Sequence, residues 1–458
     1  MMKTNSDSNE IGIKNACKLC TPLGASLAFK GIKGAIPFLH GSQGCATYIR
    51  RYLISHYKEP MDIASSNFSE ETAVFGGGAN LKLGLSNITK QYEPVLIGVA
   101  TTCLSETIGD DVPMFLDEYK KYDDGGQKSH LVHVSTASYR GTHRNGYNDA
   151  VKATVASLLN KVGKTVTDER QVNLFPGMVS PKDIRYLKEI LSDFNLRFIV
   201  LPDYSETLDG GLWSEYQKIP DGGTDVSDIL KMGNSSLSIE FGRILANEDS
   251  AGKFLESTFD VPCKSMGLPV GVKETDIFFK SLEGLAGMDT PEKYQGERAR
   301  LIDSYVDGHK YVAGKKAFVF GDEELVVGLA SFLSEIGIKP VLCATGGQSG
   351  LLKKKIMEVN PLFSEPDCIV SEGIDFVGIM DFAKMLKPDI LLGSSKGYHI
   401  AREMELPLVR VGFPIHDRVG GSRVSHLGYR GAQELFDRIA NALIETKQAS
   451  SDVGYSYI

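Results

Sequence analysis

The stretch AFVFGD, residues 317–322, indicates the fold of this chain most clearly. It is a short apolar run that ends in a glycine and an acidic residue, as expected of a buried parallel strand that turns into a helix. Further strand-like runs follow at residues 340–343, 389–394 and 408–412, with helical segments at residues 323–336 and 376–386. Alternating strands and helices of this kind predict a doubly wound parallel sheet.

The same alternation occurs upstream in two further groups. One contains apolar runs at residues 95–100 and 131–134, and the other has runs at residues 172–175 and 198–201 around the amphipathic stretch 183–194. We therefore predict an α/β protein with three similar doubly wound units. The predicted domains are residues 1–165, residues 166–292, and residues 293–458 with a C-terminal helix. The first of these carries Cys20, Cys45 and Cys103. Polar linkers are expected near residues 161–170 and 289–295.

Composition excludes several classes of partner. The 458 residues carry a net charge of −8 from 50 basic and 58 acidic side chains, without a basic run that could follow a phosphate backbone. Nucleic-acid binding is therefore not expected. The first ten residues are polar, and no apolar stretch approaches the ~18 residues of a membrane span. We expect a cytoplasmic protein that does not bind membranes.

The cysteines give the main indication of function. Seven is an odd number in a chain of this length, which argues against a disulfide framework and for a reducing compartment. Cys20, Cys45 and Cys103 each lie in a turn rich in glycine or hydroxyl residues. Thiolates are the preferred ligands of iron–sulfur centres, and a four-iron core needs about four of them. These three cysteines predict part of such a site, which another subunit or a non-cysteine ligand must complete.

The context of each thiol supports this interpretation. Cys45 begins a helical stretch, so the helix N-terminus is expected to lower its pKa. Cys103 directly follows an apolar strand, at the end of the sheet where open α/β folds bind ligands. Cys17 and Cys20 form a C-x-x-C pair, but no second pair or redox-type strand supports a zinc or redox interpretation. Cys343 lies in a strand-like run and is expected to act as a small hydrophobe.

Polar residues near these turns allow two interpretations. His40 and His56 flank the Cys45 turn, and either could hydrogen-bond to a cluster sulfur or serve a structural role. Ser138 follows a strand, as Cys103 does, and its ordinary role would be to cap the next helix. Asp110 and Asp111 resemble a paired-carboxylate site, but adjacent residues point apart, which favours a pair of charges at a helix start.

Several motifs in the same order resemble one known family. They are LGA at 23–25, HGSQGC at 40–45, EP at 59–60, VFGG at 74–77, TTC at 101–103, IGDD at 108–111 and VGFP at 411–414. Together they resemble the β-type chains of the nitrogenase component 1 superfamily, and the similarity runs from about Cys17 to Ile458. The resemblance implies three Rossmann-like domains and an α-type partner chain in an α2β2 heterotetramer.

Within that superfamily, some segments look most like the scaffold on which the nitrogenase iron–molybdenum cofactor is matured. They are residues 29–35, 202–211, 417–421, 427–433 and 453–457. A scaffold role implies that Cys45 binds a [4Fe-4S] cluster shared with the α-type partner, with Cys20 and Cys103 as further ligands or near neighbours. His40 and Ser138 would lie beside this cluster. The nitrogenase iron protein would supply electrons while the complex transiently holds a precursor of the cofactor, and this chain would make no bonds itself.

Three alternatives remain at this stage. The first is the β subunit of the molybdenum–iron protein, which relays electrons through an eight-iron P-cluster. Cys20 and Cys103 match the P-cluster cysteines of that chain, and Ser138 falls where it carries a serine near its cluster. The second is a subunit of light-independent protochlorophyllide reductase, which matches these motifs less well. The third is a monomeric metabolite-binding α/β protein without a cluster.

Overall fold

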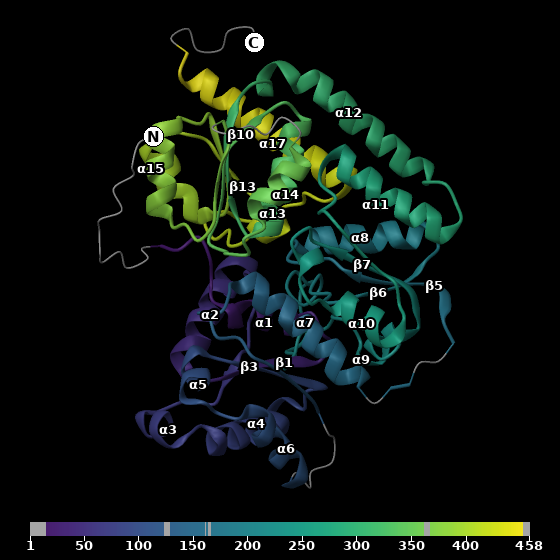
Figure 1. Cartoon of the computed structure of the whole chain (residues 1–458), viewed down its shortest axis with the longest axis vertical. Coiled ribbons are helices and arrows are strands. Elements are labelled where there is room, and N and C mark those ends of the chain that lie inside the picture. The colour runs from purple at the N-terminus through teal and green to yellow at the C-terminus, as the bar shows by residue number, and fades with distance from the viewer. Residues whose placement is uncertain (1–14, 123–128, 161, 164–165, 361–366, 452–458) are drawn as a thin grey trace.

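Three parallel sheets form the framework of the chain. The computed structural model describes residues 15–122, 129–160, 162–163, 166–360 and 367–451, and Figure 1 shows the arrangement of the elements. Every pairing between neighbouring named strands is parallel. The predicted α/β class with parallel sheets is therefore confirmed. Within the described residues, no helix combines the length and the apolar character needed to cross a membrane.

The first unit has the strand order β2-β1-β3-β4, with helices on both faces. Ile36 and Phe38 of β1 pack toward α4 and α6, whereas the alternate residues Ala35 and Leu39 pack toward α1 and α7. The elements are α1 (Thr21–Lys30), β1 (Ala35–His40), α2 (Gln43–Tyr57), β2 (Ala64–Ser65), α3 (Glu70–Phe75), α4 (Gly78–Tyr92), β3 (Leu96–Thr101), α5 (Cys103–Ile108), α6 (Val112–Tyr122), β4 (His130–Val134) and α7 (His143–Leu159).

The second unit has the order β6-β5-β7-β8 and continues into two helices that reach the third unit. Its elements are β5 (Asp168–Phe175), α8 (Pro181–Asp193), β6 (Arg197–Val200), α9 (Val226–Ile229), η1 (Met232–Asn234), β7 (Ser235–Phe241), η2 (Leu245–Asn247), α10 (Ala251–Phe259), β8 (Cys263–Met266), α11 (Gly271–Ala286) and α12 (Glu292–Val312). Helix α12 begins inside the stretch expected to be a linker at 289–295. The linker expected at 161–170 overlaps β5 and lies partly outside the described residues.

The third unit has the order β11-β10-β9-β12-β13. Phe318 and Phe320 of β9 pack toward α15 and α16, whereas Ala317 and Val319 face the other side of the sheet with α13. The elements are β9 (Lys316–Gly321), α13 (Glu323–Glu335), β10 (Lys339–Thr345), α14 (Leu352–Val359), β11 (Ile369–Ser371), α15 (Phe376–Leu386), β12 (Ile390–Gly393), η3 (Ser395–Gly397), α16 (Tyr398–Glu403), β13 (Leu408–Arg410), η4 (Gly421–Arg423) and α17 (Gly428–Ala449).

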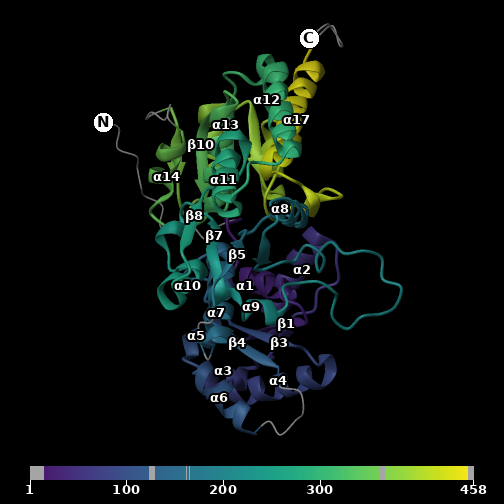
Figure 2. The ribbon, with the colours of Figure 1, turned by 90° about the vertical axis from the view of Figure 1, so that its right-hand side faces the viewer.

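One hydrophobic core joins the three units. Its buried residues extend from Leu19, ahead of the first sheet, to Leu443 on the C-terminal helix α17, which packs beside α12. Figure 2 shows the units from the side, with α8 between the first and third units and α11 beside α13. The domain boundaries given above stay predictions, because the core continues across them. The tail at 453–457 lies outside the described residues.

Helices α1 and α7 approach each other through two glycines. A Cβ on Gly24 would lie 1.7 Å from the carbonyl oxygen of His143, and one on Gly146 would lie 1.9 Å from that of Thr21. No side chain fits at either position without moving a backbone. This contact therefore fixes the start of α1 against the start of α7.

A substitution at this contact should destabilise the fold. We expect Gly24→Ala to lower the free energy of unfolding by about 3 kcal/mol, because the added methyl group meets backbone that cannot yield. Chemical denaturation followed by circular dichroism measures the change. Gly284→Ala on α11 is the matched control, since its Cβ would meet nothing within 4 Å. That control should leave stability unchanged or raise it by up to ~1 kcal/mol, and equal losses in both variants would contradict the packing argument.

Candidate functional site

The candidate site lies where the order of the first sheet reverses. From β1 the chain places β2 on one side and β3 on the other, so the carboxyl ends of β1 and β3 are neighbours. His40 at the end of β1 pairs with Thr101 at the end of β3. The segments after these strands carry Cys45 and Cys103. Such a reversal point opens a crevice in parallel α/β sheets, and ligands bind there.

Backbone contacts hold these two segments together. The backbone N–H of Thr102 donates to the carbonyl oxygen of His40 at 3.2 Å, and the Thr102 hydroxyl donates to the same oxygen at 3.1 Å. A Cβ at Gly41 would lie 2.1 Å from Oγ1 of Thr102, so only glycine permits the approach. Cys45 in the first turn of α2 and Cys103 at the first position of α5 are thereby brought to the same edge.

Cys20 reaches this edge from the start of α1. The residue is the N-cap of the helix, and the preceding Leu19 makes two hydrogen bonds to His143. The His143 N–H donates to the Leu19 oxygen at 3.0 Å, and the Leu19 N–H donates to Nδ1 of His143 at 3.3 Å. Burial lowers the pKa of His143 to about 3, which keeps its ring neutral and able to accept this bond.

Ser138 connects the Cys20 and Cys103 segments. Its Oγ accepts the N–H of Thr21, the residue after Cys20, at 3.2 Å. Its own N–H donates to Sγ of Cys103 at 3.2 Å. Ser138 was expected to cap the next helix, α7, but its hydroxyl caps the start of α1. The start of α7 is capped by Thr142 and Asn145, which form a capping box. Direct contact of Ser138 with a cofactor stays a prediction.

The Cys45 thiol resists deprotonation. Burial raises the pKa of Cys45, and the neighbouring thiols of Cys20 and Cys103 raise it further. The expectation that the helix N-terminus would lower this pKa is therefore wrong, because desolvation and repulsion between three nearby thiolates outweigh the helix. A positively charged iron core would reverse the repulsion, since thiolates are its ligands. The donor set thus fits an iron–sulfur cluster.

A site for a single metal ion is not indicated. Within the described residues, no three His, Cys, Asp or Glu side chains are arranged so that they could hold one ion. Cys45 and Cys103 are exposed and Cys20 is half-buried, so the thiols open toward the surface. A cluster contains several iron atoms, and its ligands need not converge on one point. Metal ligation by Cys20, Cys45 and Cys103 remains a prediction from the sequence.

His40 is buried at the base of the site and forms two hydrogen bonds. Nε2 donates to Oδ2 of Asp110 at 2.9 Å, so Nδ1 accepts from Oγ of Ser66 at 3.1 Å. Asp110 also accepts the N–H of Gly77 at 3.1 Å and thus ties α5 to the loop before α4. Burial lowers the pKa of His40, with Asp110 acting against it. His40 therefore braces the turn, and its expected role at a cofactor stays a prediction.

Several other sequence-based candidates lie elsewhere or act differently. His56 accepts the N–H of Ile415 at 2.8 Å and packs against Phe413, so of its two interpretations these contacts fit the structural one. Cys17 is buried and burial raises its pKa to about 12, so it is not a reactive partner of Cys20. Cys343 is buried in β10 as expected. Of the paired carboxylates, Asp111 accepts the N–H of Met114 in the first turn of α6, whereas Asp110 binds His40 and Gly77.

The buried His56 should make stability depend on pH. Burial lowers its pKa to about 3, whereas the unfolded chain binds the proton near pH 6.5. Its contribution is therefore complete above pH 6.5 and falls by about 1.4 kcal/mol per pH unit below it, or about 2 kcal/mol by pH 5. Denaturant titrations of wild-type protein and His56→Gln at pH 7 and pH 5 should show a shallower pH dependence in the variant. His399→Gln changes an exposed histidine and should keep the wild-type slope.

Comparison with known proteins identifies close relatives over nearly the whole chain. The family model described as "Nitrogenase component 1 type Oxidoreductase" matches residues 20–444. The nitrogenase molybdenum–iron protein beta chain of Clostridium pasteurianum is 36% identical, over 94% of this chain and 93% of the relative. The nitrogenase iron–molybdenum cofactor biosynthesis protein NifN of Bradyrhizobium diazoefficiens is 31% identical, over 94% of this chain and 90% of the relative. A chain of the solved structure "Nitrogenase Cp1 at pH 6.5" superimposes with a TM-score of 0.93 at 34% identity, covering 98% of both chains.

Proposed function

Because the chain belongs to the nitrogenase component 1 family as a β-type chain, we propose that it holds an iron–sulfur cluster at a boundary with an α-type partner. The observation that supports this is the gathering of Cys20, Cys45 and Cys103 at the reversal point of the first sheet. Three thiols do not complete the ligand set of a four-iron core, so the partner would supply the remainder. When bound, the cluster would transfer electrons.

The surface around the thiols suits a protein partner. Exposed apolar side chains lie on the elements that carry the cysteines or pack beside them: Tyr48 on α2, Leu104 on α5, Phe75 on α3 and Tyr139 next to Ser138. Phe75 is 83% exposed and Tyr139 is 61% exposed. Exposed aromatic residues gathered around one site are typical of a protein interface. They support pairing with an α-type chain in an α2β2 assembly.

For the specific role we propose the β-type subunit of the scaffold on which the iron–molybdenum cofactor is matured. The scaffold-like segments at 29–35, 202–211, 417–421 and 427–433 support this role, as does the similarity to NifN. Cys45 would bind a [4Fe-4S] cluster shared with the partner, and the complex would transiently hold the cofactor precursor. The nitrogenase iron protein would be the electron donor.

One observation favours a second candidate, the electron-relaying β subunit of a molybdenum–iron protein. All three thiols approach one another, and the N–H of Ser138 points at Sγ of Cys103. This arrangement suits a larger, eight-iron P-cluster as well as a four-iron one. The similarity to the Clostridium pasteurianum beta chain supports the same alternative.

Iron and sulfide analysis of the anaerobically purified complex distinguishes the two roles. For the scaffold we expect about four irons per αβ pair, as in one [4Fe-4S] cluster. Cys45→Ala should remove most of this iron, whereas Cys20→Ala and Cys103→Ala should have smaller effects. Cys263→Ala, on β8 of the second unit, is the matched control and should retain wild-type iron.

Other outcomes would overturn one or both proposals. About eight irons per pair, with equal damage from all three substitutions at the site, would favour the relay subunit. Acetylene reduction at nitrogenase-like rates would exclude the scaffold role. A colourless, iron-free pair purified under strict exclusion of oxygen would overturn both roles.

A further inference from the structure

Lys396 extends from the third unit toward the cluster segment of the first. It lies in η3, directly after β12, and its ammonium donates to the carbonyl oxygen of Ala16 at 2.8 Å. Ala16 precedes Cys20 in the short segment that leads into α1. The ammonium therefore contacts the segment that leads to Cys20, although 380 positions separate Lys396 from Ala16 in the chain.

The backbone around Lys396 is firmly held. The N–H of Ser395 donates to the oxygen of Pro414 at 2.9 Å, and the Ser395 hydroxyl donates to Asp417. A Cβ at Gly397 would lie 2.2 Å from the ring of Phe320, so η3 is pressed against β9. Contacts on both sides of Lys396 thus fix the point from which its side chain starts.

The segment that Lys396 contacts is held just as firmly. The N–H of Gly346, after β10, donates to the oxygen of Cys17 at 3.2 Å. A Cβ at Gly346 would lie 2.6 Å from the carbonyl carbon of Cys17, so the two backbones touch. Ala16 also forms a bridge with Asp375. The third unit therefore determines where the chain leading to Cys20 runs.

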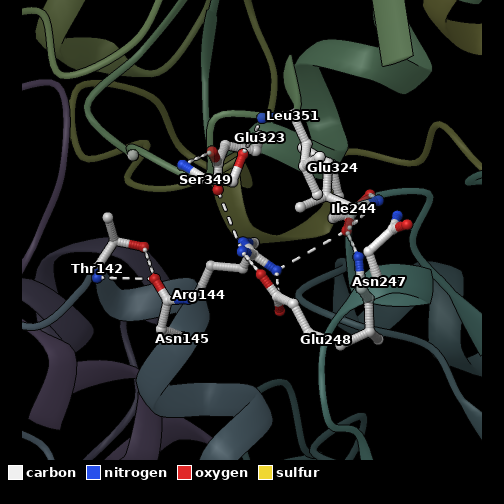
Figure 3. A network of polar contacts seen from close by, with 12 residues as sticks. Thr142, Arg144, Asn145, Ile244, Asn247, Glu248, Glu323, Glu324, Ser349 and Leu351 are labelled. Carbon is white, nitrogen blue, oxygen red and sulfur yellow. Dashed lines mark hydrogen bonds and ion pairs between the residues drawn. The ribbon is translucent and has the colours of Figure 1, made fainter. Parts of the chain in front are cut away.

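A buried charge network fixes the third unit to the first. Figure 3 shows Arg144, near the start of α7, pointing toward Glu323 and Glu324 of α13 and Glu248 of the second unit. The guanidinium lies 2.5 Å from Glu248, 3.1 Å from Glu323 and 3.8 Å from Glu324. Arg144 follows His143, which binds Leu19 beside Cys20. The same turn of α7 thus contacts both the cysteine segment and the unit that carries Lys396.

The ionisable groups that interact with Lys396 are thiols. Burial lowers the pKa of Lys396, and interactions with Cys17 and Cys20 act against this shift. Burial raises the pKa of Cys17 to about 12, so that thiol stays neutral at physiological pH. In the described part of the chain, no carboxylate lies within ion-pair distance of the Lys396 ammonium. Among the described residues, the ammonium charge thus lies against the segment that leads to Cys20 without a carboxylate partner.

We propose that Lys396 is a positioning residue of the cluster site, whose ammonium charge offsets the net negative charge that an iron–sulfur core carries together with its thiolate ligands, Cys20 among them. This inference rests on the proposed function. One-electron reduction makes such a core more negative by one unit, so a fixed positive charge nearby favours the reduced form. Lys396 should therefore raise the reduction potential of the cluster.

Redox titration of the anaerobic complex, followed by electron paramagnetic resonance, tests this role. Lys396→Met removes the charge and keeps a similar length, and we expect a lower midpoint potential with wild-type iron content. Lys396→Arg keeps the charge and should restore the potential toward the wild-type value. Lys447→Met is the control and should keep the wild-type midpoint potential. It removes an exposed charge from the last turn of α17, and Figure 1 shows this end of the helix far from α1.

Each remaining outcome decides the question. An unchanged midpoint potential in Lys396→Met would overturn the inference while leaving the proposed function intact. Loss of iron from Lys396→Met but not from Lys396→Arg, in complexes that still assemble, would support a need for the charge. Loss of iron from both variants would show that shape matters instead of charge and would overturn the inference. Absence of iron from the wild-type complex would overturn the proposed function itself.

Discussion

The contact between the ends of β1 and β3 is the constraint on which the candidate site depends. The carbonyl oxygen of His40 accepts two hydrogen bonds from Thr102, and Gly41 leaves the space that this approach needs. Without that contact, the segments carrying Cys45 and Cys103 would have no common edge. His40 and Asp110 extend the same bracing to the loop before α4. The thiols are thus placed by backbone and buried polar groups, and their own side chains remain available to a ligand.

Charge is distributed around this edge in a consistent way. Partial burial and then the neighbouring Cys20 and Cys103 raise the pKa of Cys45, and the neighbouring His143 is kept neutral by burial. Positive charge comes instead from Lys396 of another unit. Thiolates at such a site are stabilised by a ligand that carries positive charge at its centre. Such dependence on the ligand is common where metal binding and folding are coupled.

The sequence predicted those elements whose signals come from residues close together in the chain. Helix α15 was expected at 376–386 and is found there, because its apolar spacing and the Asp375 cap are both visible in the chain. Strand β1 was not predicted, because a proline such as Pro37 is unusual inside a sheet. The proline is tolerated here because β2 pairs only with Phe38 and Leu39. The candidate cysteines stood out by residue type. The roles of Asp110, His143 and Lys396 could not be predicted, because each depends on a partner distant in the chain.

The route of the first described residues has a consequence for how the protein is made. The segment that ends in Cys20 rests on Gly346, Asp375 and Lys396, which a ribosome adds long after it. The first unit alone supplies the contacts of His143 and Ser138 on either side of Cys20, but the residues ahead of Cys20 lack their supports until the last quarter of the chain has emerged. Translation order would therefore delay the full support of the thiol set until nearly the whole polypeptide exists.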